Sequence, residues 1–132
     1  MSGVLLDTNV LIDYLRDIPQ AVKYLETNPS QMSISALTVV ELRAGTRDDA
    51  ERQRLGQFTS SFDVIPADSR ICELGGDFRA RYAPSHGVDL IDGIIAATAL
   101  VRDLALVTLN KKHFPMLANV ITPYRRSKSP DT

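Results

Sequence analysis

Oxygen-bearing side chains suited to holding a cation occur at four widely spaced points of the sequence: Asp7, Glu41, Asp92 and Asn110. If the fold brings the three carboxylates within about 4–6 Å of one another, each pair repels by roughly 3–4 kcal/mol at an effective dielectric of about 20. A hard divalent cation is the simplest compensation, and oxygen ligands without histidine or thiolate suit Mg²⁺ or Mn²⁺ better than Zn²⁺. The chemistry that such a site predicts is metal-assisted hydrolysis of a phosphodiester.

The elements that must position these side chains alternate along the chain. Short apolar runs predict strands at 4–6, 32–34, 64–65, 105–107 and 120–121. Between them, helices are predicted at 8–15, from Pro19 onward, from Ser35 or Thr38 to Gly45, at 48–58, at 66–83 with a break at Pro84, and at 89–103. This alternation predicts an α/β fold, a three-layer α/β/α domain with a parallel sheet of four to five strands. The helix at 89–103 is apolar almost all round, Leu100 included, so we expect it to be buried.

In a parallel sheet covered by helices, the carboxyl ends of the strands and the amino ends of the helices share one edge, where ligands bind. Asp7 follows the first predicted strand, and Asn110 lies just past the fourth. Glu41 and Asp92 lie in the first turns of predicted helices. We therefore expect all four side chains to reach the same crevice.

Each of these residues also has a local explanation. Asp7 could be the N-cap of the helix that follows it, and Glu41 could close a capping box opened by Thr38. Asp92 could favour the positive end of a helix dipole, and Asn110 could form a turn. A single shared site accounts for all four positions with one cause, so we favour it.

Three further polar side chains are candidates for a supporting role. Thr8 and Thr108 could orient a carboxylate or a water molecule through their hydroxyl groups, or could serve local structure alone. Asp89 lies on the same helical face as Asp92, and we interpret it as an N-cap, with a secondary contact to metal or water as the alternative.

Other reactive residue types fit no catalytic pattern. Asp13 falls on a different helical face from Asp7 and is expected at the surface, and Cys72 is expected to be a small core residue. Neither His86 nor His113 belongs to a Ser/His/Asp arrangement, so we expect no catalytic histidine.

The chain has 132 residues, with 15 basic and 16 acidic side chains and a formal charge of −1. This length predicts one domain over 1–126, followed by a polar tail at 127–132. The near-neutral charge excludes a broad cationic surface for nucleic acid and leaves local phosphate contacts. The candidates for those contacts are Arg16, Arg43, Lys111 and Lys112. A single cysteine, no apolar run of about 18 residues and no basic leader predict a cytoplasmic protein that does not enter a membrane.

Four segments of the chain resemble the motifs of PIN-domain nucleases: 4–13, 35–42 with the glycine at 45, 87–99 and 106–114. Their order and spacing are closest to VapC-type toxins of type II toxin–antitoxin pairs, and the resemblance extends from Val4 to about Pro123. It implies a Mg²⁺- or Mn²⁺-dependent endoribonuclease that acts on RNA, forms a homodimer, and is held inactive by a cognate VapB-type antitoxin whose peptide lies across the active cleft.

The resemblance also implies roles for single residues. Asp7, Glu41 and Asp92 correspond to the metal-binding acids of the family, and Asn110 stands where the wider family often has aspartate, which leaves a second metal site open. Gly93 stands where alanine is usual. It would cost about 1 kcal/mol of helix propensity, and we expect it to loosen that turn.

Two alternatives come from other classes of protein. One is a catalytically silent PIN-like domain that acts as a binding module, against which the intact set of three acids argues. The other is a small phosphohydrolase in which Asp7 attacks phosphorus as a nucleophile. That class normally carries a second aspartate two residues later, where this chain has Asn9.

Overall fold

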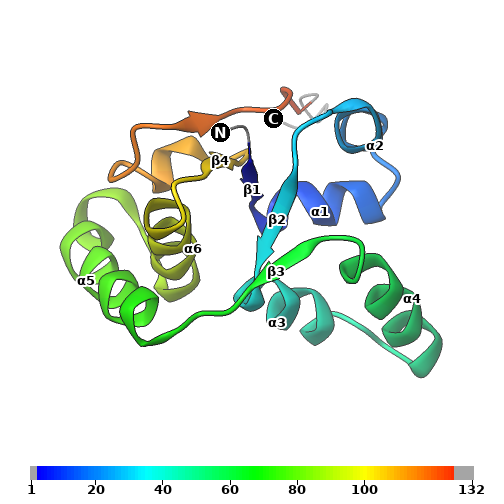
Figure 1. The fold of residues 1–132 in the computed structure, drawn as a ribbon, viewed down its shortest axis with the longest axis horizontal. Helices are drawn as coiled ribbons and strands as arrows, with labels where there is room; N and C mark the ends of the chain where they lie inside the picture. Colours follow the sequence, from blue (N-terminus) through cyan, green and yellow to red (C-terminus); the bar gives the residue numbers. More distant parts are fainter. Residues whose placement is uncertain (1–2, 127–132) are drawn as a thin grey trace.

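Five short parallel strands form the centre of the computed structural model, which describes residues 3–126 (Figure 1). The predicted tail at 127–132 lies outside the described residues. The strands run in the order β3-β2-β1-β4-β5. Their bounds are β1 (Val4–Leu6), β2 (Met32–Ser35), β3 (Asp63–Ile65), β4 (Ala105–Val107) and β5 (Val120–Ile121). The predicted parallel sheet is therefore confirmed, with five strands where four to five were expected.

Helices cover both faces of this sheet, which confirms the predicted three-layer α/β/α arrangement (Figure 1). Within β1, Leu5 packs in a cluster with residues of α6, whereas Val4 and Leu6 pack in a second cluster with residues of α1, α3 and α4. Side chains alternate across a strand, so three residues are enough to contribute to two cores. The helical bounds are α1 (Thr8–Leu15), α2 (Pro19–Thr27), α3 (Ala36–Ala44), α4 (Asp49–Thr59), α5 (Ser69–His86), α6 (Leu90–Val101) and a single 3₁₀ turn, η1 (Lys111–His113).

The observed ends of α5 differ from those predicted. The helix begins at Ser69 because the Asp68 side chain caps it, accepting a hydrogen bond from the Ile71 amide at 3.0 Å. It also continues through Pro84, where a break is predicted; Pro84 lies in the last turn, and the helix extends only two residues beyond it. The helix ends at Gly87, whose φ of 65° lies in the left-handed region that favours glycine.

Helices α5 and α6 approach each other through two glycines. A Cβ atom added to Gly93 would lie 2.3 Å from the carbonyl oxygen of Gly75, and one added to Gly75 would lie 2.9 Å from the Cα atom of Ile94. The expectation that Gly93 loosens its turn is therefore wrong, because the absence of a side chain permits the close contact. The expectation that α6 is buried all round is also wrong, since Leu100 is 54% exposed. The sheet and α5 cover only the sides of α6 that face them.

Two residues outside the predicted site lie where the sequence did not place them. Asp13, expected at the surface, is buried and accepts hydrogen bonds from the Tyr124 hydroxyl at 2.9 Å and from Arg126 at 3.0 Å. The segment that follows β5 supplies both donors, and helical periodicity carries no information about it. Cys72, expected in the core, is exposed on α5. Across residues 3–126, the structure has no helix that combines the length and the apolar character needed to cross a membrane.

Candidate active site

Asp7 lies at the point of the sheet where the order in which strands are added reverses. The chain builds β2 and β3 on one side of β1, and β4 and β5 on the other. The connections therefore diverge between β1 and β4, which is where parallel α/β sheets form a crevice. The Asp7 amide donates to the carbonyl of Val107 at 2.9 Å, and the Thr108 hydroxyl donates to Asp7 Oδ2 at 2.7 Å. The predicted first acid and its predicted supporting hydroxyl are thus in contact.

Thr8 joins Asp7 to the second acid. Its backbone amide donates to Asp7 Oδ1 at 2.8 Å, and its hydroxyl donates to Glu41 Oε1 at 2.6 Å. Because that proton is used on Glu41, the contact of 2.9 Å between the Thr8 and Thr38 hydroxyls has Thr38 as the donor. Ser35 caps α3, so the capping box considered for Thr38 and Glu41 is wrong.

Asp92 is held at the amino end of α6 by Asp89. The Asp89 side chain accepts a hydrogen bond from the Asp92 amide at 2.8 Å, and the Asp89 amide donates to Asp92 Oδ2 at 3.3 Å. This reciprocal capping box shows that Asp89 is the N-cap of α6. It also directs one oxygen of Asp92 back toward its own helix.

Asn110 connects the end of β4 to Asp92 through a histidine. The backbone amide of Asn110 donates to the Thr108 hydroxyl oxygen at 3.0 Å, and the side-chain amide of Asn110 lies 2.8 Å from His113 Nδ1. That same ring nitrogen lies 3.3 Å from Asp92 Oδ2. One continuous network therefore contains the four predicted catalytic residues: it runs through Glu41, Thr8, Asp7, Thr108, Asn110, His113 and Asp92.

The sequence did not predict His113, Thr38 or Asn9 as members of this network. Asn9, noted only as departing from the phosphohydrolase pattern, lies 3.4 Å from both the Thr108 hydroxyl and the Leu109 amide, which ties α1 to the end of β4. The signal that was available is the position of His113 three residues after Asn110, within a single 3₁₀ turn.

Burial and mutual repulsion act on the acids together. Burial raises the pKa of Asp7, hydrogen bonds from Thr108 and Thr8 lower it, and the nearby charges of Glu41 and Asp89 raise it again. Burial also raises the pKa of Asp92 to about 6, with the charges of Asp89 and Asp7 adding to the rise, while the Asp89 amide and His113 oppose it. Glu41, Asp89 and Asp92 therefore lie near enough to Asp7 for their charges to interact, as a shared site requires.

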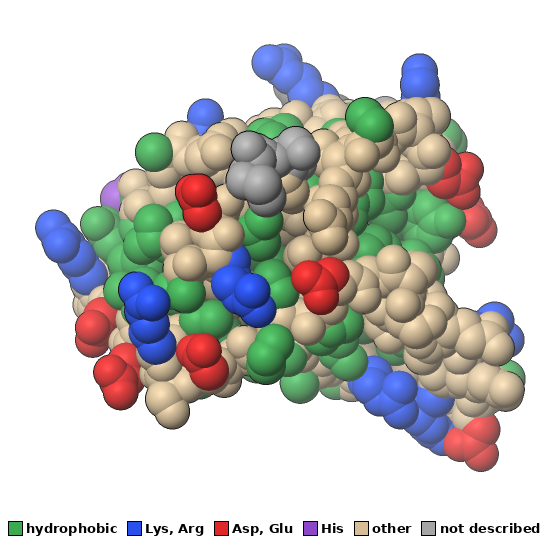
Figure 2. Space-filling model, in the orientation of Figure 1, with side chains coloured by type: hydrophobic (Ala, Val, Ile, Leu, Met, Phe, Trp, Pro, Cys, Tyr) green, Lys and Arg blue, Asp and Glu red, His purple; other side chains and the backbone are tan. Residues whose placement is uncertain are grey.

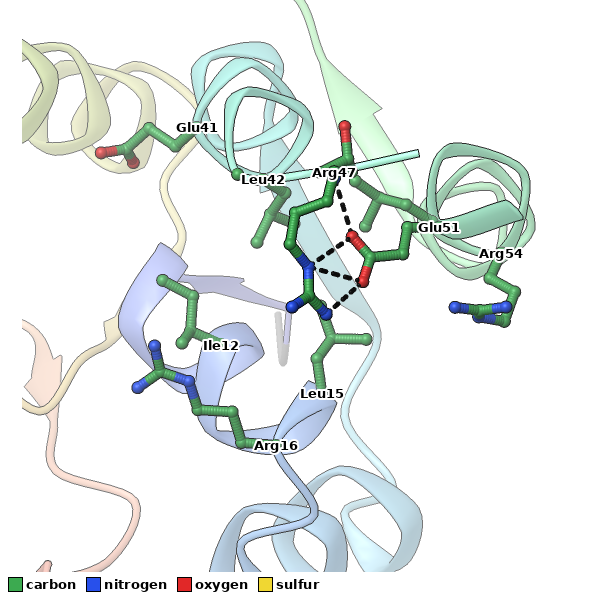
Figure 3. A pocket seen from close by; sticks show the side chains of 11 residues that line it. Ile12, Leu15, Arg16, Glu41, Leu42, Arg47, Glu51 and Arg54 are labelled. Carbon is green, nitrogen blue, oxygen red and sulfur yellow. Dashed lines mark hydrogen bonds and ion pairs between the residues drawn. The ribbon is translucent and has the colours of Figure 1, made fainter. Parts of the chain in front are cut away.

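A groove of about 650 Å³ between α1, α3 and α4 reaches Glu41 (Figure 3). Figure 3 shows the Glu41 carboxylate at one end, pointing away from the hydrogen-bonded pair of Arg47 and Glu51. The groove is lined by apolar side chains of α1, α3 and α4 and by the basic side chains of Arg16, Arg47 and Arg54. The labelled lining residues are Ile12, Leu15, Arg16, Glu41, Leu42, Arg47, Glu51 and Arg54.

The structure brings one of the four predicted phosphate contacts to the groove, and the other three are exposed side chains elsewhere on α3 and η1. Arg16 lines the groove with Glu41. Arg43 is exposed on α3, and Lys111 and Lys112 are exposed on η1, directly after Asn110. Figure 2 shows basic and acidic side chains mixed over the face that it presents, in agreement with the near-neutral charge.

The donor set fits a hard cation, although the acids are not drawn fully together. Among residues 3–126, no three histidine, cysteine or acidic side chains stand close enough to hold a metal ion as they are. The available donors are carboxylate oxygens, which suit Mg²⁺ or Mn²⁺. Each of the three acids has one or both oxygens held by a protein donor, and a cation would require the carboxylates to move toward one another.

The fold and this network define a class of protein with known members. The PIN-domain family matches residues 4–119, and the chain therefore belongs to that family. Within it, the chain is similar to Ribonuclease VapC10 of Mycobacterium tuberculosis, with 40% identity over 124 residues and 92% of each chain covered. Ribonuclease VapC19 of the same organism is 38% identical over 124 residues, which cover 91% of this chain and 98% of that protein.

A solved toxin–antitoxin complex from Klebsiella pneumoniae contains a chain with a similar fold. The TM-score is 0.80 at 34% sequence identity, and the match covers 93% of this chain and 99% of that one. Both the sequence and the fold are thus shared over nearly the whole length.

Proposed function

We propose that this protein is a Mg²⁺- or Mn²⁺-dependent endoribonuclease, the toxin of a type II toxin–antitoxin pair. The observation that carries the proposal is the single network that joins Asp7, Glu41 and Asp92 at the divergence of β1 and β4. The similarity to proteins named ribonucleases supports an RNA substrate. Membership of the PIN-domain family favours this reaction over a phosphohydrolase with an aspartyl nucleophile.

Asp7, Glu41 and Asp92 would hold the cation. When bound, a divalent cation neutralises charge at the scissile phosphate and activates water for attack on phosphorus. Thr108 fixes Asp7, Thr8 fixes Glu41 by hydroxyl donation, and the capping box fixes the backbone of Asp92.

Asn110 adds a neutral amide to the site. Its side chain lies on His113, beside the carboxylate of Asp92. A carboxylate at this position would increase the repulsion that already raises the pKa of Asp92. We propose that Asn110 belongs to the catalytic set through this placement.

The substrate and partners follow from the surroundings of the acids. We propose that Arg16, Arg43, Lys111 and Lys112 contact RNA phosphates on either side of the site, because basic groups there would position the backbone without reading its sequence. The toxin–antitoxin complex from Klebsiella pneumoniae supports a cognate VapB-type antitoxin as the inhibitor. We further propose a homodimer that acts in the cytoplasm, where a single cysteine stays reduced.

Cleavage of total cellular RNA by the purified protein tests this function. We expect cleavage that requires Mg²⁺ or Mn²⁺, stops in EDTA and is lost in Asp7→Asn, with 5′-phosphate and 3′-hydroxyl ends. A 2′,3′-cyclic phosphate would mean that the 2′-hydroxyl of the RNA attacks, which contradicts a hydrolysis by water. RNA binding without cleavage at any metal concentration would identify a catalytically silent binding module.

A further inference from the structure

Two of the three acids are each oriented by a hydroxyl group from another element. Thr108, after β4, donates to Asp7 at 2.7 Å, and Thr8, on α1, donates to Glu41 at 2.6 Å. Groups that hold a metal ligand from behind fix its orientation and its affinity for the metal. Among residues 3–126, no hydroxyl group holds Asp92 in this way. Its carboxylate accepts a hydrogen bond from the backbone amide of Asp89, at 3.3 Å.

The side chain that lies against Asp92 is that of His113. Its Nδ1 atom lies 3.3 Å from Asp92 Oδ2, and both side chains are largely enclosed, with exposed fractions of 26% and 17%. The Asn110 side chain lies 2.8 Å from the same ring nitrogen. A nitrogen that donates to Asp92 cannot also accept from an amide NH₂ group, so we assign the Asn110 amide with its oxygen toward the Nδ1–H group. A Cβ atom added to Gly87 would lie 3.8 Å from His113 Nε2, so the turn that joins α5 to α6 runs near the ring. The contacts of the imidazole with Asn110 and Asp92 both lie at Nδ1.

We propose that His113 is a positioning residue that orients Asp92 for the divalent cation, an inference that rests on the proposed function. His113 Nδ1 and the Asp89 amide both contact Oδ2 of Asp92. The other oxygen, Oδ1, accepts no hydrogen bond from residues 3–126, so the carboxylate presents it to the site. Without the imidazole, only the long contact to Asp89 resists rotation of the carboxylate.

This role differs from general acid or base catalysis in what it predicts. His113 contacts a ligand of the metal and its neighbour Asn110, so its loss weakens metal binding and leaves the chemistry of the bound site intact. Loss of an orienting partner typically lowers metal affinity by about 10–100-fold. Saturating metal should therefore restore kcat in a His113 variant, whereas it would not replace a missing proton donor.

The test measures Mn²⁺ affinity of the purified protein by electron paramagnetic resonance of the free ion. His113→Phe keeps the ring and removes the N–H donor, and His113→Asn keeps a donor near the position of Nδ1. We expect His113→Phe to bind Mn²⁺ about tenfold more weakly and His113→Asn to bind within about threefold of wild type. His86→Phe, at the exposed histidine bonded to Ser85, should not change the affinity.

Equal Mn²⁺ affinity of wild type and a folded His113→Phe overturns the proposal. If His113→Phe does not fold, His113→Gln takes its place, because glutamine places its amide near Nε2 instead of Nδ1. Equal affinities of the Asn and Gln variants then overturn it, and a Gln variant about tenfold weaker than the Asn variant supports it. If wild type binds Mn²⁺ and needs His113 to do so but cuts no RNA, the proposed function fails and the positioning role stands.

Discussion

Gly93→Ala tests the close packing that places Asp92. By helix propensity alone, alanine in α6 would stabilise the protein by about 1 kcal/mol. The structure predicts the opposite sign, because the new Cβ atom would lie 2.3 Å from the carbonyl oxygen of Gly75, where real Cβ contacts are not shorter than 3.0 Å. The two helix backbones must then separate by about 0.7 Å, which is the difference between those distances. Overpacking of this kind costs about 1–3 kcal/mol.

Two other glycines in helices provide matched controls. A Cβ atom on Gly56 in α4 or on Gly76 in α5 would meet no atom within 4 Å, so alanine there should bring only the gain in propensity. For a domain of this size, about 1 kcal/mol corresponds to roughly 4 °C in Tm. Thermal melts followed by circular dichroism should therefore show Gly56→Ala and Gly76→Ala a few degrees above wild type, and Gly93→Ala about 4–12 °C below these two controls.

Separation of α5 and α6 should also disturb the site, because Asp92 directly precedes Gly93 in α6. Gly93→Ala should lower metal-dependent RNA cleavage at temperatures where the variant remains folded. A Gly93→Ala variant with a Tm equal to that of the two control variants would refute the close approach of the two helices and the placement of Asp92 that depends on it.

Two further predictions concern a partly buried carboxyl group, Asp92, and a buried one, Asp13. In EDTA, the pKa of Asp92 is about 6 in the folded protein against 3.8 for the free side chain, so its ionisation removes stability as pH rises from about 4 to 6. Urea melts should show Asp92→Asn gaining about 1–2 kcal/mol on wild type between pH 4 and pH 7, after allowance for partial exposure; a gain that shrinks with pH would contradict the origin of this shift. Asp13→Asn should cost about 1–2 kcal/mol in the same assay, because it removes a charged acceptor that holds Tyr124 and Arg126; an unchanged urea midpoint would show that this contact does not stabilise the fold.

The sequence was sufficient for the features that depend on local pattern and on general rules of topology. The run Val4–Leu6 between Gly3 and Asp7 is too short for a helix, and a strand there followed by a helix fixes Asp7 at the carboxyl edge of the sheet. The same rule places Asp92, because the edge is shared by every strand end and helix start in a parallel sheet. The prediction that the acids share this edge therefore needs no distance, only the strand order.

Three features that the sequence did not predict depend on a partner far away along the chain. Asp13 is buried by residues more than one hundred positions later, and Gly93 is required by a backbone carbonyl in another helix. His113 is informative only once η1 is known to lie against the start of α6. Helical periodicity and residue spacing describe one element at a time, so they do not show such pairings.

The most direct test of the central claim is Mn²⁺ affinity in three single variants, Asp7→Asn, Glu41→Gln and Asp92→Asn. Their carboxylates come from three different elements, and the account predicts that each variant loses at least tenfold in affinity because all three hold the same cation. Asp77→Asn, at an exposed acid on α5, is the control and should bind as wild type does. Wild-type affinity in any folded variant of the three would contradict a shared metal site.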